Sequence, residues 1–195
     1  MKSALLILST VLCLPTVVFA GDRMLFTFDR PDSASRWRAV NDTVMGGRSD
    51  GRFKINDQQQ FEFYGNLSLE NNGGFASVRS RGGRLGLVTG DTIVAKVRGD
   101  GRKYSMSLYT PQRRMAFSYR ASFQTKPDEW MIVRLPLDKF VATSFGRVLP
   151  GRQLDPRTVV GIGLFLGDKK PGPFELEVDW IKATQTDLRP VSSGK

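Results

Sequence analysis

The chain has 195 residues, a formal net charge of +10, one cysteine and no histidine. Without an imidazole, neither a Ser-His-Asp nor a Cys-His catalytic arrangement can form, and zinc sites built on histidine are excluded. Any catalysis would therefore depend on carboxylates, lysine, tyrosine or a bound cofactor.

Residues 1–20 have the pattern of a secretory signal peptide. An apolar run from 4 to 14 follows a single lysine, and Val18 and Ala20 place small residues at the −3 and −1 positions. The pattern predicts cleavage after Ala20 and an exported, periplasmic or secreted location. The alternative is an uncleaved anchor, although the apolar run is short for a span of about 20 residues. Because Cys13 lies in this segment, the predicted mature chain also lacks disulfides and Cys/His metal sites.

The predicted mature chain consists of short strands separated by turns. Apolar and polar residues alternate with the period of a half-buried strand in several runs. These runs cover residues 61–69, 93–98, 104–109, 115–123 and 174–180. The segment 159–166 is apolar on both faces, as expected for a central strand that is covered on both sides.

No run of a dozen residues shows the 3.6-residue period of a helix, and glycine-rich turns separate the strands. The pattern predicts an all-β fold, an antiparallel β-sandwich or jelly roll. A chain of this length is usually one domain. We expect a signal peptide over 1–20, a single domain over 21–183 and a flexible C-terminal tail over 184–195.

Two segments, 37–49 and 71–79, combine Asn or Asp with adjacent glycines. These residue types tolerate positive φ and hydrogen-bond to their own backbone. Such loops are either structural corners between strands, which the residues alone favour, or surfaces that present amides and carbonyls to a sugar or a peptide. The candidate binding residues are Trp37, Asn41, Asp42, Met45, Gly46, Gly47, Ser49, Asn71, Asn72, Gly73, Gly74 and Phe75.

In their order along the chain, these motifs resemble the complex I intermediate-associated protein 30 family. The matching patterns are W-x-x-V-N-D-x-V-M-G-G-x-S over 37–49, L-S-L-E-N-N-G-G-F-A-S-V-R over 67–79, R-G-D-G-x-x-Y over 98–104 and G-P-F-E-L-E-V-D-W-I over 172–181. The resemblance covers roughly residues 24–183. It implies a galactose-binding-like jelly roll and a chaperone-like role in the assembly of respiratory complex I, and it brings no catalytic residue set.

Three tryptophans are candidates for stacking on a sugar ring. Trp180 continues the apolar alternation of its strand and Trp130 opens another strand, so both are predicted to lie in the core. Trp37 is the best stacking candidate because it adjoins the first motif, with burial as its alternative.

Carboxylates are the only plausible catalytic acids. The acids near turns are Asp42, Asp50, Asp91, Asp100 and Asp128. Glycoside hydrolysis would need two acids facing each other in a cleft, whereas aspartate in a glycine-flanked turn usually stabilises the turn. Calcium is conceivable with Asp100 as one ligand, but no spaced acidic loop is present. We expect no cofactor, no metal and no catalysis.

The positive charge is clustered, for example at Arg79, Arg81 and Arg84. A basic face attracts acidic proteins, anionic lipids or acidic glycans, and the alternative is a solvated surface. No nucleic-acid-binding motif is present, so we expect no nucleic acid partner. The sequence therefore predicts an exported binding module for a protein partner, which the resemblance identifies with membrane-associated respiratory complex subunits. Glycan binding is the alternative.

Overall fold

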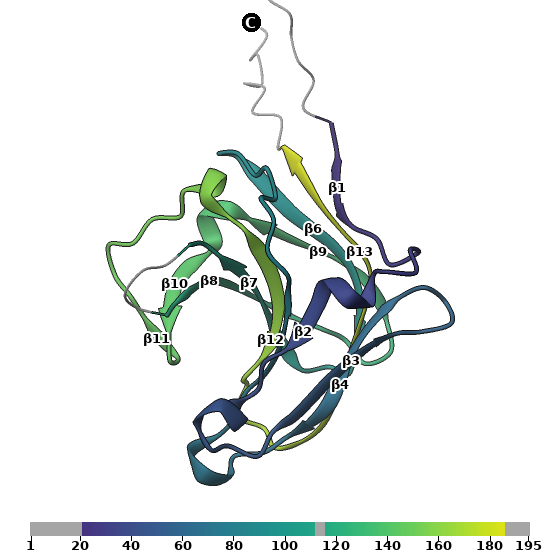
Figure 1. The fold of residues 1–195 in the computed structure, drawn as a ribbon, viewed down its shortest axis with the longest axis vertical. Coiled ribbons are helices and arrows are strands. Elements are labelled where there is room, and N and C mark those ends of the chain that lie inside the picture. The colour runs from purple at the N-terminus through teal and green to yellow at the C-terminus, as the bar shows by residue number, and fades with distance from the viewer. Residues whose placement is uncertain (1–20, 112–115, 186–195) are drawn as a thin grey trace, which may run out of the picture.

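The computed structural model describes residues 21–111 and 116–185. In these residues the chain forms thirteen β-strands and five short 3-10 helices (Figure 1). The strands are β1 (Arg23–Phe26), β2 (Trp37–Ala39), β3 (Asp50–Ile55), β4 (Phe61–Leu67), β5 (Ala76–Ser80), β6 (Asp91–Gly99), β7 (Lys103–Tyr109), β8 (Ser118–Gln124), β9 (Trp130–Pro136), β10 (Val141–Ser144), β11 (Arg147–Val148), β12 (Gly161–Leu166) and β13 (Gly172–Gln185). The 3-10 helices are η1 (Ala34–Arg36), η2 (Asp42–Met45), η3 (Glu70–Asn72), η4 (Leu137–Lys139) and η5 (Pro156–Thr158).

The strands form two sheets. Sheet A has the order β3-β4-β13-β6-β9, with β1 paired to β13, and sheet B has the order β11-β10-β8-β7-β12-β5-β2. All of these strand pairs are antiparallel. The two sheets lie against each other in Figure 1. The predicted antiparallel β-sandwich is therefore confirmed.

The core lies between the sheets because the period of two turns every second side chain inward. Phe61 and Phe63 of sheet A are fully buried, as are Met106 and Leu164 of sheet B. Each such side chain contributes about 1.5–3 kcal/mol on burial. The apolar residues of the alternating pattern that predicted these strands are thus the residues that pack between the two sheets.

The apolar segment 159–166 contains β12, which lies between β7 and β5 at the centre of sheet B. Its inward residues include the buried Leu164. Its other face carries Gly163, which the Tyr109 ring approaches, and Phe165, which the Arg120 guanidinium covers at 3.6 Å from the ring centroid. Both faces of this strand are covered, as predicted.

Two tryptophans that were predicted to lie in the core are instead half-buried on the outer side of sheet A. A register shift immediately before Trp180 reverses the alternation, so that Ile181 takes the buried position. Trp130 lies beneath Lys96 and Arg98, each 5.1 Å from its ring centroid. Alternation in the sequence does not reveal a bulge, and this is why the prediction for Trp180 was wrong. Trp130 shares the outer face of β9 with the exposed Ile132, while Val133 and Leu135 point into the core.

The last strand extends slightly beyond the predicted domain. Thr184 pairs with Thr92 and Gln185 with Asp91, so the first two residues of the predicted tail belong to sheet A. Residues 1–20 and 186–195, which hold the predicted signal peptide and the rest of the tail, lie outside the described residues. Within the described residues, no helix has the length and apolar character needed to cross a membrane.

Candidate functional site

The two sequence motifs meet at one end of the sandwich. The helix η2 lies in the connection from β2 to β3, and η3 lies in the connection from β4 to β5. The guanidinium of Arg48 donates to the carboxylate of Glu70 at 2.7 Å across these connections. We call the region formed by residues 41–51 and 68–77 the Asp42 corner.

A buried carboxylate organises the Asp42 corner. Asp42 has no exposed surface, and its Oδ1 accepts a hydrogen bond from the Ser49 amide at 2.9 Å. Its Oδ2 accepts from the Ser49 hydroxyl at 2.6 Å and from the amides of Gly74 and Phe75 at 2.6 and 3.2 Å. One side chain therefore joins segments that are 32 residues apart in the sequence.

The surroundings of Asp42 keep it ionised. Burial raises the pKa of the Asp42 carboxyl, but the hydrogen bonds from Ser49, Gly74 and Phe75 stabilise the charged form more strongly. The pKa therefore lies below its ordinary value. At neutral pH the corner holds a buried anion that is satisfied by hydrogen-bond donors rather than by a cation.

The glycines of the motifs make room for this carboxylate. A Cβ atom on Gly47 would lie 2.5 Å from Oδ1 of Asp42, and one on Gly73 would lie 2.6 Å from Oδ2. Gly46 ends η2 with a φ of 88°, a conformation that residues with a side chain adopt rarely. These three glycines therefore serve the construction of the corner.

The asparagines of the motifs also bond inside the corner. The Asn41 amide group donates to the Gly51 carbonyl at 2.9 Å, and its oxygen accepts from the Ser77 amide at 3.4 Å. The Asn71 amide group donates to the Gly46 carbonyl at 3.2 Å. The neighbouring Asn72 is exposed, with a φ of 58°. Most polar side chains of the two motifs thus form hydrogen bonds within the corner, as expected if the motifs are structural corners between strands.

Three large apolar side chains are exposed on the corner, which also carries the exposed Arg48 and Glu70. Val44 and Met45 on η2 are 71% and 51% exposed, and Leu69 in the adjacent connection is 40% exposed. We call these three residues the apolar tip. Of these three residues, only Met45 is among the binding candidates predicted from the sequence. The Val44-Met45 pair within an otherwise polar loop is the signal that could have indicated the tip.

The rings of the two aromatic candidate residues pack against other aromatic rings. Trp37 is only 3% exposed and packs against Phe26 and Phe61, with ring centroids 5.1 and 4.6 Å away. It is a core residue, so its ring has no face free for stacking on a sugar. Phe75 stacks on Phe165, with centroids 5.6 Å apart.

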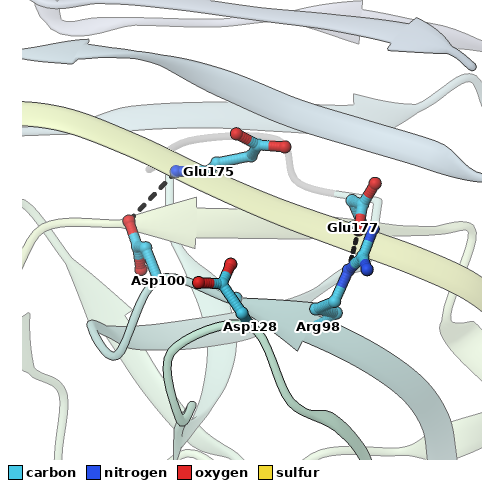
Figure 2. A pocket seen from close by; sticks show the side chains of 6 residues that line it. Arg98, Asp100, Asp128, Glu175 and Glu177 are labelled. Atoms are coloured by element: carbon cyan, nitrogen blue, oxygen red, sulfur yellow. Dashed lines mark hydrogen bonds and ion pairs between the residues drawn. The ribbon is translucent and has the colours of Figure 1, made fainter.

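A second group of polar residues lines a pocket on the outer side of sheet A. Its volume is about 290 Å³, and Figure 2 shows its lining side chains, which come from β6, β13 and two turns. Asp100 accepts hydrogen bonds from the Tyr104 hydroxyl and the Glu175 amide, both at 3.0 Å. Asp128 lines the same pocket. Two of the five acids near turns, Asp100 and Asp128, therefore share one pocket.

Three glutamates beside this pocket bring their carboxylate oxygens within 4.8 Å of one another: Glu62, Glu175 and Glu177. Such oxygens are the ligand type of hard cations. Two of the three already have cationic partners, since Lys54 lies 3.1 Å from Glu62 and Arg98 pairs with Glu177. The sequence alone does not reveal this cluster, because only the pairing of β4 with β13 places Glu62 opposite Glu177.

The cluster predicts a stabilising substitution. Burial raises the pKa of the Glu175 carboxyl, and the charges of Glu62 and Glu177 raise it further. The ionised form is therefore less stable in the folded protein than in the unfolded chain. Glu175→Gln is expected to raise the thermal unfolding midpoint at pH 7 by less than about 2 °C. The gain should shrink as the pH falls toward 4.5, where the wild type also takes up the proton.

Thermal unfolding followed by circular dichroism at several pH values measures this effect. Glu129→Gln is the control, because Glu129 pairs with Lys126 at 3.1 Å, outside the cluster. It should give no gain. A gain for Glu175→Gln that stays the same at every pH would contradict the explanation.

Solved structures share this fold. A family 11 carbohydrate-binding module from Clostridium thermocellum, in complex with a β-1,3-1,4-mixed-linked tetrasaccharide, has a TM-score of 0.62 at 15% identity and covers 86% of this chain and 97% of its own. An agarase has a TM-score of 0.59 at 11% identity, covering 85% of this chain and 25% of its own. At these identities the similarity concerns the fold alone.

Two curated relatives are named "Complex I intermediate-associated protein 30, mitochondrial". The Mus musculus protein is 27% identical over 86% of this chain and 58% of its own length. The Drosophila melanogaster protein is 27% identical over 86% of this chain and 65% of its own length. The chain thus spans less than two thirds of the length of these two relatives.

These relatives contradict the exported, periplasmic or secreted location that we predicted from residues 1–20. Their names place them in mitochondria, and that of the Neurospora crassa relative, 25% identical over 84% of this chain, does the same. The prediction was wrong because it used only a short apolar run with few charges, whereas the relatives match across the folded domain.

The family comparison agrees with the order of motifs along the chain. The model of the family described as "Complex I intermediate-associated protein 30 (CIA30)" matches residues 26–178. This range runs from the end of β1 to the middle of β13, and it includes both connections of the Asp42 corner. The chain therefore belongs to the complex I intermediate-associated protein 30 family.

Proposed function

We propose that this chain is a non-catalytic binding module that associates with a protein subunit of respiratory complex I during assembly, in mitochondria. The names of its relatives support the setting. The observation that carries the proposal is the apolar tip of Val44, Met45 and Leu69, which is exposed on a corner pinned by the buried Asp42.

Rigidity makes this tip suited to binding. An exposed apolar side chain gains free energy when a partner covers it, but a mobile loop loses conformational entropy in the same step. The hydrogen bonds to Asp42 order the corner before the partner arrives. The expected partner surface is an apolar pocket, because Val44 and Met45 offer no polar side-chain group to recognise.

Protein binding accounts for the site better than glycan binding. A glycan would need an exposed aromatic ring to stack on, and the candidate ring, that of Trp37, is buried among Phe26, Phe28 and Phe61. The similarity to carbohydrate-binding modules concerns the fold. We therefore propose the apolar tip, rather than an aromatic platform, as the binding surface of the Asp42 corner.

The test is a double substitution, Val44→Ser with Met45→Ser. Tagged full-length protein is used to recover complex I subunits from detergent-solubilised mitochondrial membranes, and the recovered subunits are quantified by mass spectrometry. Losing central apolar contacts is expected to reduce recovery by about tenfold or more.

A matched control substitutes Phe145 and Val148 with serine. These residues are 76% and 62% exposed at the hairpin of β10 and β11, outside the Asp42 corner. The control should recover subunits as the wild type does, and thermal unfolding of both variants verifies that they are folded. Equal recovery by a folded Val44→Ser/Met45→Ser variant would exclude the tip as the binding surface.

A further inference from the structure

The outer face of sheet B carries a row of residues contributed by four neighbouring strands. Gly163 of β12 pairs with Arg79 of β5 on one side and with Ser107 of β7 on the other. Ser107 in turn pairs with Arg120 of β8. Side chains at paired positions point to the same face of a sheet. The row therefore has an arginine at each end and two small residues between them.

Both arginines lean inward across the central strands. The guanidinium carbon of Arg79 lies 5.0 Å from the centroid of the Tyr109 ring, which belongs to β7, two strands away. That of Arg120 lies 3.6 Å from the centroid of the Phe165 ring, which belongs to β12 and is also two strands away. Both guanidinium groups thus reach over the two central strands of the sheet, where the Tyr109 ring also lies against Gly163. We call Arg79, Ser107, Arg120 and Gly163 the arginine site.

The floor of the arginine site contains hydrogen-bonding groups without a protein partner. Ser107 has no exposed surface, and its hydroxyl has no hydrogen-bond partner within the described part of the chain. The Nε atom of Arg79 is buried and equally lacks a partner there. Buried polar groups are normally paired, because leaving one unpaired costs about 1–3 kcal/mol. Two such groups in one row leave hydrogen-bonding capacity that no described protein group satisfies.

The charge of the site is also uncompensated. Residues 21–111 and 116–185 contain no ion pair to Arg79 or Arg120, whereas on sheet A the Arg98 guanidinium pairs with Glu177. Burial lowers the pKa of Arg120, and the charge of Arg79 acts in the same direction. Both effects disfavour the cation in the free protein, and the opposite charge of an anion bound to both guanidinium groups would offset them.

We propose that the arginine site binds the phosphate group of a small phosphate monoester. A phosphate monoester carries a charge of about −1.5 to −2 at pH 7, which matches two guanidinium groups, and it offers three acceptor oxygens. The planar guanidinium donates two parallel hydrogen bonds to such oxygens, and stacking on Phe165 or Tyr109 orients its plane. A carboxylate would compensate only one of the two charges.

The rest of the ligand has a place beside the site. A pocket of about 290 Å³ lies on the same face of sheet B, lined among others by Lys103, Ser105, Ser122 and Phe165. Ser105 and Ser122 occupy paired positions two residues from Ser107 and Arg120, so the pocket continues the row. Hydroxyl and ammonium groups around an aromatic ring suit a hydroxylated organic group. The pocket borders the Asp42 corner, since Lys169 of its lining and Leu69 of the apolar tip both lie beside Gly74. The phosphate proposal rests on the arginine site and does not depend on the proposed protein partner.

Calorimetric titration of the full-length protein tests the proposal with three probes: glucose 6-phosphate, inorganic phosphate and glucose. We expect saturable binding of glucose 6-phosphate, weaker binding of inorganic phosphate and no binding of glucose. Arg79→Gln and Arg120→Gln should each weaken binding of glucose 6-phosphate roughly tenfold to a hundredfold, the range for losing hydrogen bonds to a charged group. Arg134→Gln on β9 of sheet A is the matched control and should bind as the wild type does.

Two further measurements separate binding from folding. Thermal unfolding shows which variants are folded, and Arg120→Lys keeps the charge and the stem while removing the planar group, so it should still weaken binding. Amide signals of Ser107 and Gly163 in two-dimensional NMR should shift on adding glucose 6-phosphate. The proposal is overturned if neither phosphate binds, if glucose binds as tightly as glucose 6-phosphate, or if folded arginine variants bind unchanged.

Discussion

Replacing Asp42 with asparagine is expected to lower the free energy of unfolding by about 3 kcal/mol or more. The carboxylate accepts hydrogen bonds from the Ser49 amide and hydroxyl and from the amides of Gly74 and Phe75. Hydrogen bonds to a charged group contribute about 1.5–3 kcal/mol each. The asparagine side chain has nearly the same shape, but its amide nitrogen is a donor that would face other donors. Urea unfolding followed by circular dichroism measures the change.

The pH dependence of stability provides a second test of Asp42. Its pKa is lowered in the folded protein from an ordinary value of 3.8. A lowered pKa means that the stabilisation is present above pH 3.8 and is lost as the pH falls through the folded pKa. The wild type should therefore lose more stability on acidification below pH 4 than Asp42→Asn does. Parallel losses in the two proteins would show that this carboxylate does not stabilise the corner.

A matched control for Asp42 is Asp50→Asn. Asp50 is exposed and pairs with the nearby Arg52 at 2.6 Å. Exposed ion pairs contribute little to stability because water screens them. The control variant should unfold at nearly the same urea concentration as the wild type. A loss comparable to that of Asp42→Asn would assign the effect to net charge rather than to the buried hydrogen bonds.

Trp37→Ala is expected to destabilise the protein by about 3–5 kcal/mol, the range for removing a large aromatic side chain from a core. The ring packs against Phe26, Phe28 and Phe61, with centroids 4.6–6.2 Å away. Removing it leaves a cavity among aromatic rings that cannot close without moving both sheets. Urea unfolding again measures the effect.

Trp130→Ala is the control for Trp37. Trp130 is half-buried, and its contacts include the cations of Lys96 and Arg98. Cation-π contacts at exposed positions contribute about 0.5–1 kcal/mol. The expected loss is therefore smaller than for Trp37→Ala. Equal stability of Trp37→Ala and the wild type would mean that this tryptophan is a surface residue, as a sugar-stacking role requires.

Local patterns predicted the fold better than the site. Alternation in residues 104–109 and 174–180 marked two strands that the structure contains as β7 and β13. The same alternation placed Trp180 in the core, and one register shift in β13 turned it outward. A period of two is a property of neighbouring residues, whereas a bulge depends on the partner strand.

The candidate site shows the same division. Asn, Asp and Gly types predicted tight corners at both motifs, and the structure has them. The sequence could not show that the Asp42 carboxylate accepts a hydrogen bond from the Gly74 amide, because this bond forms only when β2 and β5 lie side by side. For the same reason it selected Met45 without Val44 and Leu69, whose exposure depends on what the corner leaves uncovered.

By itself, the sequence excluded catalytic and zinc sites built on histidine. It also determined the all-β class and the family of the chain. These follow from residue types and from short-range periodicity. Only the tertiary structure decided which tryptophan is buried, that Asp42 is a structural anion, and that Arg79 and Arg120 share one face of sheet B. The physical reason is that burial and charge compensation depend on which strands pair, and this chain pairs strands that lie far apart in its sequence.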